Sequence, residues 1–425
     1  MKKIQVGMAA MTAGLVALTG CGTGSGSQSA DPAPPSGQKA SIVVAMWAGA
    51  QSDQDALNAQ IDIARKQNPD IDIQLRTAPW TDFFTKQTTE MASGQMACVT
   101  GMNSGMLAGY VDGFDEMTDA DLATAGLSKD LLSPGSLDIL SYKGKTYGVP
   151  FDISAMLTYY NADMFKAAGV ADPKPGWTFD DFEAAAKATT GNGKYGFGIG
   201  MGAFQWQALP IAKSGTQPVT ADGTLQFDNP AFADAAAWYA GLVTDKKVAA
   251  PVASASDSGW GEEQYAAGNT AMAVDGTWNA VSYLKNESGF NAGMTTLPTG
   301  PNGSLSLILG SGYGIAKTCD NKPAALKVLG SLLSKDSQDY VASSGRSFPA
   351  RMESQPLYYQ SIDEKYRDMV TTVFKAAFAN VQGEYVSDNW AQVDAYIQPQ
   401  LASVYNGQAS MTDVLKTVQQ QFGTS

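Results

Sequence analysis

Residues 41–75 read SIVVAMWAGAQSDQDALNAQIDIARKQNPDIDIQL, and this stretch decides the fold class. Ser41 to Trp47 is a short apolar run rich in Val and Ile, which is typical of a buried strand. From Asp53 the apolar residues recur at helical spacing until Asn68 and Pro69 end the pattern. Alternating apolar residues from Ile71 to Leu75 then predict a second strand. A strand, a helix and a strand in this order predict a parallel α/β sheet with both faces covered.

The same stretch predicts where a ligand binds. A further short apolar run, Ala97 to Met102, indicates a third strand. Ligands of open α/β sheets bind beyond the carboxyl ends of the strands. This rule selects residues that follow the three strands, namely Trp47, Gln51, Trp80 and Asn103, as candidate ligand-binding residues.

The composition restricts the chemistry of the chain. Its 425 residues are 44% apolar and 16% charged, which indicates a globular protein too long for one ordinary core. The net charge is −13 and no basic run follows Lys2 and Lys3, so nucleic acid is a poor partner. The absence of histidine excludes Ser-His and Cys-His nucleophiles and removes the commonest metal ligand. We expect no cofactor and no metal, but catalysis by a pair of carboxylates remains open.

The N-terminus has the pattern of an export signal. Lys2 and Lys3 precede a short apolar run, Val6 to Leu18, and Cys21 stands where a cleavage site is expected. The sequence Leu-Thr-Gly-Cys at 18–21 resembles the bacterial lipoprotein signal, and the alternative is an ordinary secretory signal with an incidental Cys. The resemblance implies a signal peptide over 1–20 and a lipidated, palmitate-bearing Cys21 that anchors an extracytoplasmic protein to the cell membrane. Residues 21–39 are expected to form a flexible tether, since they are rich in Gly, Ser and Pro.

A longer motif lies in the middle of the chain. Residues 147–166 read YGVPFDISAMLTYYNADMFK and resemble the signature of the extracellular solute-binding proteins of bacterial ABC importers, the maltose-binding-protein-like class. The sequence departs from the signature at Leu157 and Thr158. Four further segments are similar to this family in order and spacing: 175–182 (PGWTFDDF), 263–278, 310–316 (GSGYGIA) and 345–351 (GRSFPAR).

The resemblance implies an architecture and a function. It implies two α/β lobes, each a mostly parallel sheet with flanking helices, joined by hinge crossings near 148–151, 297–304 and 346–351. Residues 40–149 and 304–347 would form the N-terminal lobe, and residues 150–298 and 352–425 the C-terminal lobe. The protein would be a monomeric lipoprotein that captures a carbohydrate, specifically an oligosaccharide, between the lobes and delivers it to the transmembrane subunits of an ABC importer. It would not be an enzyme.

Aromatic residues are the main candidates for contacts with a sugar, because ring faces pack on the apolar C–H face of a sugar. By resemblance, Trp278 matches a stacking aromatic of the family. Trp206, Trp260 and Trp390 lie next to loop-forming sequence, and for each of them a place in the core is the alternative.

Polar candidates lie at the crossings that the resemblance implies. Asp152 follows the first crossing and could accept hydrogen bonds from hydroxyls, or it could form a hinge ion pair with Arg346 or Arg351. Gly312 in the glycine-rich segment and Arg346 in the last crossing complete the expected ligand site.

Two other functions remain open. A glycosidase would use a pair of carboxylates. A peptide-binding or structural surface lipoprotein would need a cleft with matched charges for peptide termini.

Two cysteines remain after Cys21. In folds of the family that the chain resembles, the return strand runs antiparallel beside the third strand, which would place Cys98 and Cys319 close enough for a disulfide. The alternative is two buried, inert thiols.

Overall fold

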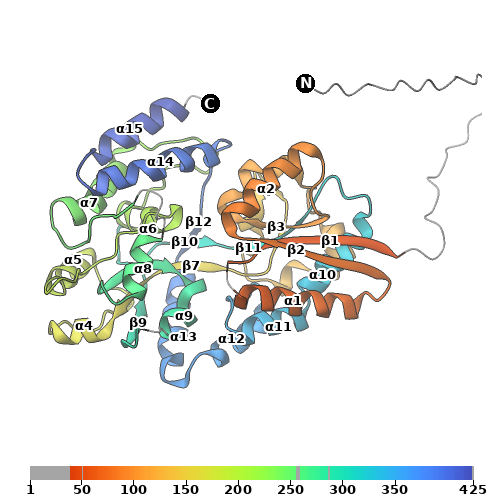
Figure 1. The fold of residues 1–425 in the computed structure, drawn as a ribbon, viewed down its shortest axis with the longest axis horizontal. Coiled ribbons are helices and arrows are strands. Elements are labelled where there is room, and N and C mark those ends of the chain that lie inside the picture. The colour runs from red at the N-terminus through yellow and green to blue at the C-terminus, as the bar shows by residue number, and fades with distance from the viewer. Residues whose placement is uncertain (1–38, 50, 255–258, 286–287, 424–425) are drawn as a thin grey trace, which may run out of the picture. The chain divides into compact units, whose positions relative to one another are not determined.

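The computed structural model of the protein describes residues 39–49, 51–254, 259–285 and 288–423. The expected signal peptide (1–20), Cys21 and the tether up to residue 38 lie outside the described residues. From Lys39 onward the described residues form two α/β lobes, each with its own sheet (Figure 1). The two-lobe α/β fold class expected from the sequence is confirmed.

The first sheet contains the βαβ unit that opens the chain. Its strand order is β2 (Ile71–Ala78), β1 (Ala40–Trp47), β3 (Val99–Asn103), β11 (Ser311–Ile315) and β6 (Val149–Pro150). The pairs β1–β2 and β1–β3 are parallel, whereas β11 pairs antiparallel with β3 and with β6. The strands predicted over 41–47, 71–75 and 97–102 therefore exist, with ends shifted by one to three residues.

Helices cover both faces of the first sheet, which explains why β1 is apolar on both sides. Ile42, Val44 and Met46 of β1 share a buried cluster with residues of α1 (Gln51–Gln67) and α10 (Lys322–Leu332). Ala45 belongs to a second cluster together with residues of α2 (Trp80–Ser93). Figure 1 shows α2 on one side of the sheet and α1 and α10 on the other.

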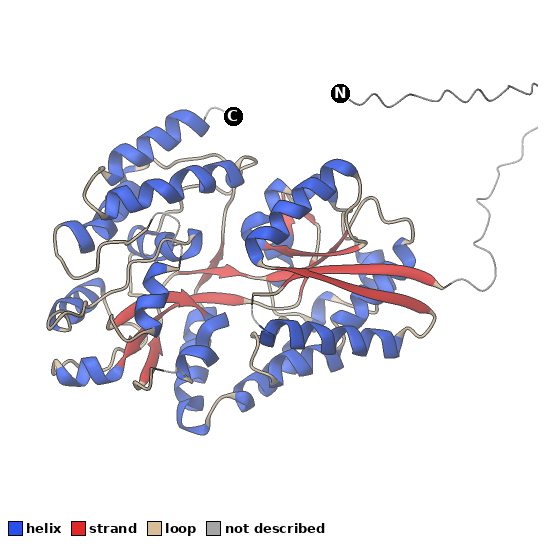
Figure 2. Cartoon of the chain, in the orientation of Figure 1, coloured by secondary structure: helices blue, strands red, loops and turns tan. Residues whose placement is uncertain are grey.

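The second sheet is built around β7 (Ser154–Asn161). Strand β7 pairs antiparallel with β8 (Met272–Gly276), β9 (Ala292–Thr295) and β10 (Ser306–Leu309), and β10 pairs parallel with β12 (Val381–Gly383). The apolar core of this lobe packs mainly against helices α5 (Phe179–Ala188), α6 (Ala203–Ser214), α7 (Pro230–Thr244), α14 (Trp390–Tyr405) and α15 (Met411–Phe422). Figure 2 shows the strands of the two lobes meeting in the middle of the described fold.

Each sheet contains one reversed strand, and that strand follows a crossing between the lobes. Strands β8, β9, β10 and β12 share one direction and β7 opposes them, as β11 opposes the other strands of the first sheet. The carboxyl edges of the two sheets face each other. A chain that leaves one sheet at this edge and runs straight into the other therefore enters the second sheet from its carboxyl edge, against the direction of its other strands. The crossings β6–β7 and β10–β11 therefore produce the two exceptions to an otherwise parallel arrangement.

The second crossing lies later than the sequence predicts. Residues 297–304 remain in the second lobe, where Gly300 and Gly303 close a tight turn, and Ser306–Leu309 form β10 of the second sheet. The chain crosses at Gly310 instead. The resemblance implied a crossing at 297–304, and the lobe boundary that it placed at residue 304 is wrong because β10 still belongs to the second sheet.

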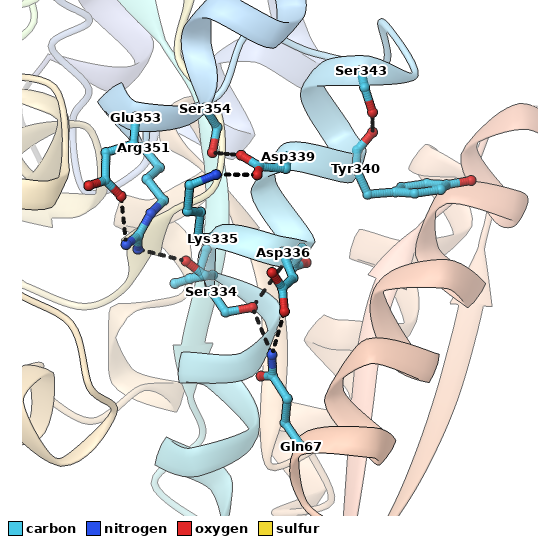
Figure 3. Close-up of polar contacts among 12 residues, drawn as sticks. Gln67, Ser334, Lys335, Asp336, Asp339, Tyr340, Ser343, Arg351, Glu353 and Ser354 are labelled. Atoms are coloured by element: carbon cyan, nitrogen blue, oxygen red, sulfur yellow. Dashed lines mark hydrogen bonds and ion pairs between the residues drawn. The ribbon is translucent and has the colours of Figure 1, made fainter.

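The third crossing runs along the first. The backbone N–H of Ile153 donates to Phe348, and that of Ala350 donates to Phe151 (both 3.0 Å). The helix that precedes this crossing, α11 (Lys335–Ser343), is tied to the chain that follows it, because Ser354 Oγ donates to Asp339 (2.7 Å) (Figure 3). Within that following chain, Arg351 pairs with Glu353.

The remaining elements complete the two lobes. The helices of the second lobe include α5 (Phe179–Ala188), α6 (Ala203–Ser214), α7 (Pro230–Thr244), α13 (Glu364–Phe378), α14 (Trp390–Tyr405) and α15 (Met411–Phe422). The shorter α-helices are α3 (Asp119–Thr124), α4 (Ala162–Ala167), α8 (Trp260–Ala266), α9 (Ala280–Leu284) and α12 (Gln355–Ser361). A hairpin, β4 (Ser141–Tyr142) and β5 (Lys145–Thr146), and the 3-10 helices η1 (Ser104–Gly109), η2 (Val111–Gly113), η3 (Lys129–Leu131), η4 (Ser136–Leu140), η5 (Thr277–Asn279) and η6 (Met352–Ser354) lie between them.

Cys98 and Cys319 are joined by a disulfide, with their Cα atoms 4.7 Å apart. Cys98 directly precedes β3 and Cys319 lies just beyond β11. The bond therefore closes the distal end of an antiparallel strand pair, which is where the resemblance implied it.

Candidate functional site

A cleft of about 700 Å³ lies at the carboxyl edges of the two sheets. Residues of both lobes line it, together with residues of all three crossings. The lining side chains combine aromatic rings, carboxylates and amides: Trp47, Asp53, Trp80, Asn103, Met106, Phe151, Asp152, Phe204, Gln205, Trp278, Asn279, Arg346, Trp390, Asp394 and Gln398.

The first lobe contributes a cluster of aromatic rings. Trp47 ends β1, and Trp80 begins α2 directly after β2. Their rings meet edge to face with centroids 4.9 Å apart, and Phe84 lies 4.7 Å from the Trp80 ring. Trp80 is one of the few large apolar side chains that remain exposed (39%). The parallel register of β1 and β2 brings these two strand ends together.

The second lobe faces this cluster with aromatic rings of its own. Trp278 follows β8, and the Phe204 ring lies 6.4 Å from it, edge to face. Trp390 begins α14 and stacks on Phe227 with centroids 6.2 Å apart. The Trp278 indole packs directly on Gly276, where a Cβ would lie 2.0 Å from the ring. Only glycine at position 276 permits this placement of the indole.

Asp152 lies at the centre of the hinge. It is buried, and its Oδ1 accepts a hydrogen bond from the backbone N–H of Ser311 on the second crossing (2.7 Å). Burial raises the pKa of Asp152 to about 6, although the Ser311 N–H and the charge of Arg346 act in the opposite direction. Asp152 thus ties the first two crossings together while it lines the cleft.

Arg346 on the third crossing forms its ion pair with Asp53. The Nε of Arg346 lies 3.4 Å from Oδ1 of Asp53, and its guanidinium lies over the Phe151 ring at 5.3 Å. Asp53 also accepts the backbone N–H of Gly49 (3.0 Å). Arg351 forms its ion pair with Glu353. Asp152 therefore forms an ion pair with neither Arg346 nor Arg351 among the described residues, although the sequence left both pairs open.

Asp275 organises the polar wall around Trp278. This buried carboxylate accepts four hydrogen bonds: Gln205 Nε2 (3.2 Å), the N–H of Gly276 (2.8 Å), Asn279 Nδ2 (2.7 Å) and the Tyr283 hydroxyl (2.6 Å). Gln205 and Asn279 line the cleft. Each amide gives one N–H to Asp275 and has a second N–H and a carbonyl oxygen besides, so both residues can offer a donor or an acceptor to a ligand.

Helix α14 presents a mixed face to the cleft. Trp390, Asp394 and Gln398 are spaced four residues apart and all line the cleft. Burial raises the pKa of the Asp394 carboxyl to about 6.

Seven of the predicted ligand-binding residues line this cleft: Trp47, Trp80, Asn103, Asp152, Trp278, Arg346 and Trp390. Four others do not, so placing them in the ligand site was wrong. Gln51 is exposed and donates to Asp55 (2.8 Å). It is the first residue of α1 and does not belong to the loop that follows β1.

The other three are packing residues. Trp206 is almost fully buried (1%) in the core of the second lobe, on the inner face of α6. Trp260 packs against the same core. Gly312 lies inside the first sheet, where a Cβ would meet the Val149 carbonyl at 2.2 Å, so this glycine is required for close strand packing.

Sequence reasoning missed Asp53, Phe204, Gln205, Asp394 and Gln398. The spacing of Asp394 and Gln398 from Trp390 was a usable signal, since residues four apart share a helix face. No comparable signal marks Phe204 or Gln205, which reach the cleft because the N-terminal end of α6 lies there. Asp53 has the sequence position of a helix-capping residue, which gave no reason to place it in a ligand site. Its carboxylate does accept a backbone N–H, from Gly49.

The described residues include neither a cluster of metal ligands nor a helix of membrane-spanning length and hydropathy. Among them, no group of three or more His, Cys, Asp or Glu side chains could hold a metal ion. None of the helices in the described part of the chain is long and apolar enough to cross a membrane.

Comparisons with known proteins agree with the fold. The profile of the family described as bacterial extracellular solute-binding protein matches residues 48–339. A putative binding protein of Brucella abortus (strain 2308) is 25% identical over 363 residues, covering 82% of this chain and 84% of the relative. A maltooligosaccharide ABC transporter solute-binding lipoprotein of Streptococcus pneumoniae (strain ATCC BAA-255 / R6) is 27% identical over 318 residues, covering 67% and 69%.

A solved structure shares the fold of this chain. An ABC substrate-binding protein from Listeria monocytogenes in complex with cycloalternan superposes with a TM-score of 0.80 at 23% identity, covering 91% of this chain and 99% of that one. The match of the family profile to more than two thirds of the chain, with this shared fold, shows that the chain belongs to the bacterial extracellular solute-binding protein family.

Proposed function

We propose that the protein captures an oligosaccharide in the interlobe cleft and delivers it to the transmembrane subunits of an ABC importer. The observation that carries the proposal is the aromatic lining of both lobes, with Trp47 and Trp80 on one side and Trp278 and Trp390 on the other. Such rings pack on the C–H faces of sugars. The carboxylates and amides between them supply acceptors for hydroxyl groups.

The size of the cleft supports an oligosaccharide over a single sugar. A volume of about 700 Å³ lies within the usual range of ligand pockets, and the rings are distributed over several strand and helix ends. Several separate platforms favour two or more sugar units. The names of relatives agree: one is a maltooligosaccharide-binding lipoprotein, and another was solved with cycloalternan.

We test this function with a thermal-shift screen against a panel of oligosaccharides of varied linkage and length. A ligand that binds only the folded state raises the melting temperature by the linkage term RT ln(1 + [L]/Kd). We expect stabilisation by oligosaccharides and little or none by peptides. Stabilisation by peptides, with no response to any oligosaccharide, would overturn the proposal and favour the peptide-binding alternative.

We further infer that the protein binds sugar without cleaving it. The family consists of binding proteins, and the chain lacks histidine. Chromatography of each stabilising oligosaccharide after long incubation with the protein should return it intact. Cleavage products that accumulate with protein concentration would identify a glycosidase.

We infer that Cys21 carries the lipid that holds the protein at the membrane, as a monomer. A relative named as a lipoprotein supports this anchor. A Cys21→Ser protein that stays in the membrane fraction would contradict it.

A further inference from the structure

Glu384 is a buried carboxyl with no hydrogen-bond partner. It directly follows β12, and neither carboxylate oxygen is exposed or hydrogen-bonded among the described residues. Its Oε2 lies 2.8 Å from the point where a Cβ on Gly105 would stand, and a ring carbon of Phe204 lies 3.0 Å from the same point. Gly105 and Phe204 both line the cleft, one from each lobe. Glu384 is not itself a lining residue, but its carboxyl packs directly behind two residues that line the cleft from opposite lobes.

A second carboxyl accompanies it. Asp394 on α14 lines the cleft, and its negative charge adds to the effect of burial on Glu384. Burial in the first place, and Asp394 in the second, raise the pKa of Glu384 to about 8. Gly105 and Phe204, which lie beside the Glu384 carboxyl, carry no charge.

No lining cation compensates these two carboxyls. Among the described residues that line the cleft, Arg346 is the one cationic side chain, and it is paired with Asp53. Neither Glu384 nor Asp394 takes part in an ion pair between described residues. An ionised carboxylate in such a place is costly, because burial removes its hydration without a compensating charge.

Several amides of the cleft use part of their donor capacity within the protein. Gln205 and Asn279 each give one amide N–H to Asp275. Asn103 gives its amide N–H groups to Gly310 and Ser311 (both 3.3 Å). Asp394 adds acceptor oxygens to the same lining, so a hydrogen-bond donor on a ligand would find a partner there.

We propose that the ligand is an oligosaccharide that carries a free amino group, and that its ammonium binds at Glu384 and Asp394. This inference rests on the proposed function and narrows its substrate class. An ammonium supplies both the missing positive charge and up to three donors. Charge-assisted hydrogen bonds to a buried carboxylate are stronger than those of a hydroxyl. A hydroxyl at this place would bring no positive charge to either carboxyl.

The experiment compares each neutral oligosaccharide found by the screen with derivatives in which one hydroxyl is replaced by an amino group. Affinities are measured by calorimetry at pH 7, where amines of ordinary pKa are mainly cationic. At least one amino derivative should bind roughly ten- to a hundredfold tighter than its parent, the range expected for a hydrogen bond to a charged group. No derivative binding tighter than its parent would overturn this inference and leave the proposed function standing. No binding of any oligosaccharide, neutral or amino, would instead overturn the proposed function.

Substitutions locate the effect. Glu384→Gln keeps the shape and removes the charge, so it should abolish the preference for the amino derivative while the neutral parent binds as well as before or better. The matched control is Glu364→Gln, which makes the same charge change on an exposed residue of α13 and should leave the preference intact. An amino preference that survives in Glu384→Gln would contradict the assignment.

Thermal unfolding at several pH values is the second measurement. It tests whether the variant is folded and whether Glu384 is buried without a nearby positive charge. Because its pKa is higher in the folded protein than in the unfolded chain, this residue's contribution to stability is complete at low pH and is lost as the pH rises toward 8 and beyond. The melting temperature of the unliganded wild type should therefore fall more between pH 6 and pH 9 than that of Glu384→Gln. Identical pH profiles for the two folded proteins would show that the carboxyl is compensated, and the proposal would fail.

Discussion

At the residue scale, Trp278 is the side chain whose removal should weaken binding most directly. The indole packs on Gly276 and also lines the cleft, so it is held in place before ligand arrives. Trp278→Ala should cost about 1–3 kcal/mol of binding free energy, as at other aromatic hot spots. Calorimetric titration with an oligosaccharide identified by the screen measures this loss. Tyr340→Ala removes an exposed aromatic outside the lining of the cleft and should leave the affinity unchanged.

Gly276→Ala provides an independent check of the same argument. The added methyl would lie 2.0 Å from the indole, so the ring must move although it remains present. We therefore expect this variant to weaken binding as Trp278→Ala does. Full affinity in a folded Trp278→Ala protein would instead place this residue among the packing aromatics.

Residue identity alone could not separate ligand-facing tryptophans from core tryptophans. Trp390 and Trp206 both stand beside loop-forming sequence and both are buried in the core of the second lobe (5% and 1% exposed), yet of the two only Trp390 also lines the cleft. What separates them is the direction in which each helix presents the ring, and that depends on packing partners far away in sequence. The strand-end rule succeeded for Trp47 and Trp80 because parallel register alone fixes where those residues lie.

At the element scale, the disulfide fixes two strands at their distal ends. Cys98 and Cys319 are 221 positions apart in sequence, and their bond joins the start of β3 to the segment after β11. Reduction should lower the free energy of unfolding by about 2–5 kcal/mol, because the bond restricts the unfolded chain. Urea unfolding with and without a reductant measures the difference. A Cys98→Ala, Cys319→Ala protein should be as stable as the reduced wild type.

Mass spectrometry decides whether the bond exists in the purified protein. Alkylation of the unfolded, unreduced chain should leave both cysteines unmodified. Two added alkyl groups would show that they are free thiols, and the predicted effect of a reductant on stability would then disappear.

The predictability of elements followed the strength of their local signals. The βαβ unit and the two C-terminal helices carry clear periodicity, and all of them form. Residues 195–201 (YGFGIGM) have the alternation of a strand, yet they form none, and the structure has only isolated bridges at Tyr195, Phe197 and Gly198. The crossing at Gly310 was missed because nothing local marks it: its place is set by pairing of β10 with β7 and of β11 with β3.

At the scale of the whole molecule, the crossings and the lobe contacts determine how the cleft can close. Three crossings run side by side through Asp152, Gly310 and Phe348, which permits bending at one hinge. Away from the hinge, Lys143 of the first lobe pairs with Asp388 of the second (2.9 Å) across exposed surface. An exposed pair contributes only about 0–1 kcal/mol, so it can bias closure but cannot hold the lobes shut. Ligand contacts must supply the rest of the differential free energy.

Solution X-ray scattering tests this closing mechanism. Saturating oligosaccharide should lower the radius of gyration of the wild type, because ligand that contacts both lobes favours the closed form. Lys143→Glu sets two carboxylates against each other across the lobes and should make the unliganded protein more expanded, with a modest loss of affinity. Lys335→Glu is the control, since Lys335 pairs with Asp339 within one helix and closure leaves that contact untouched. A tight ligand that leaves the scattering curve of the wild type unaltered would show that the cleft binds without closing, and the affinity would then have to come from a site already formed in the free protein.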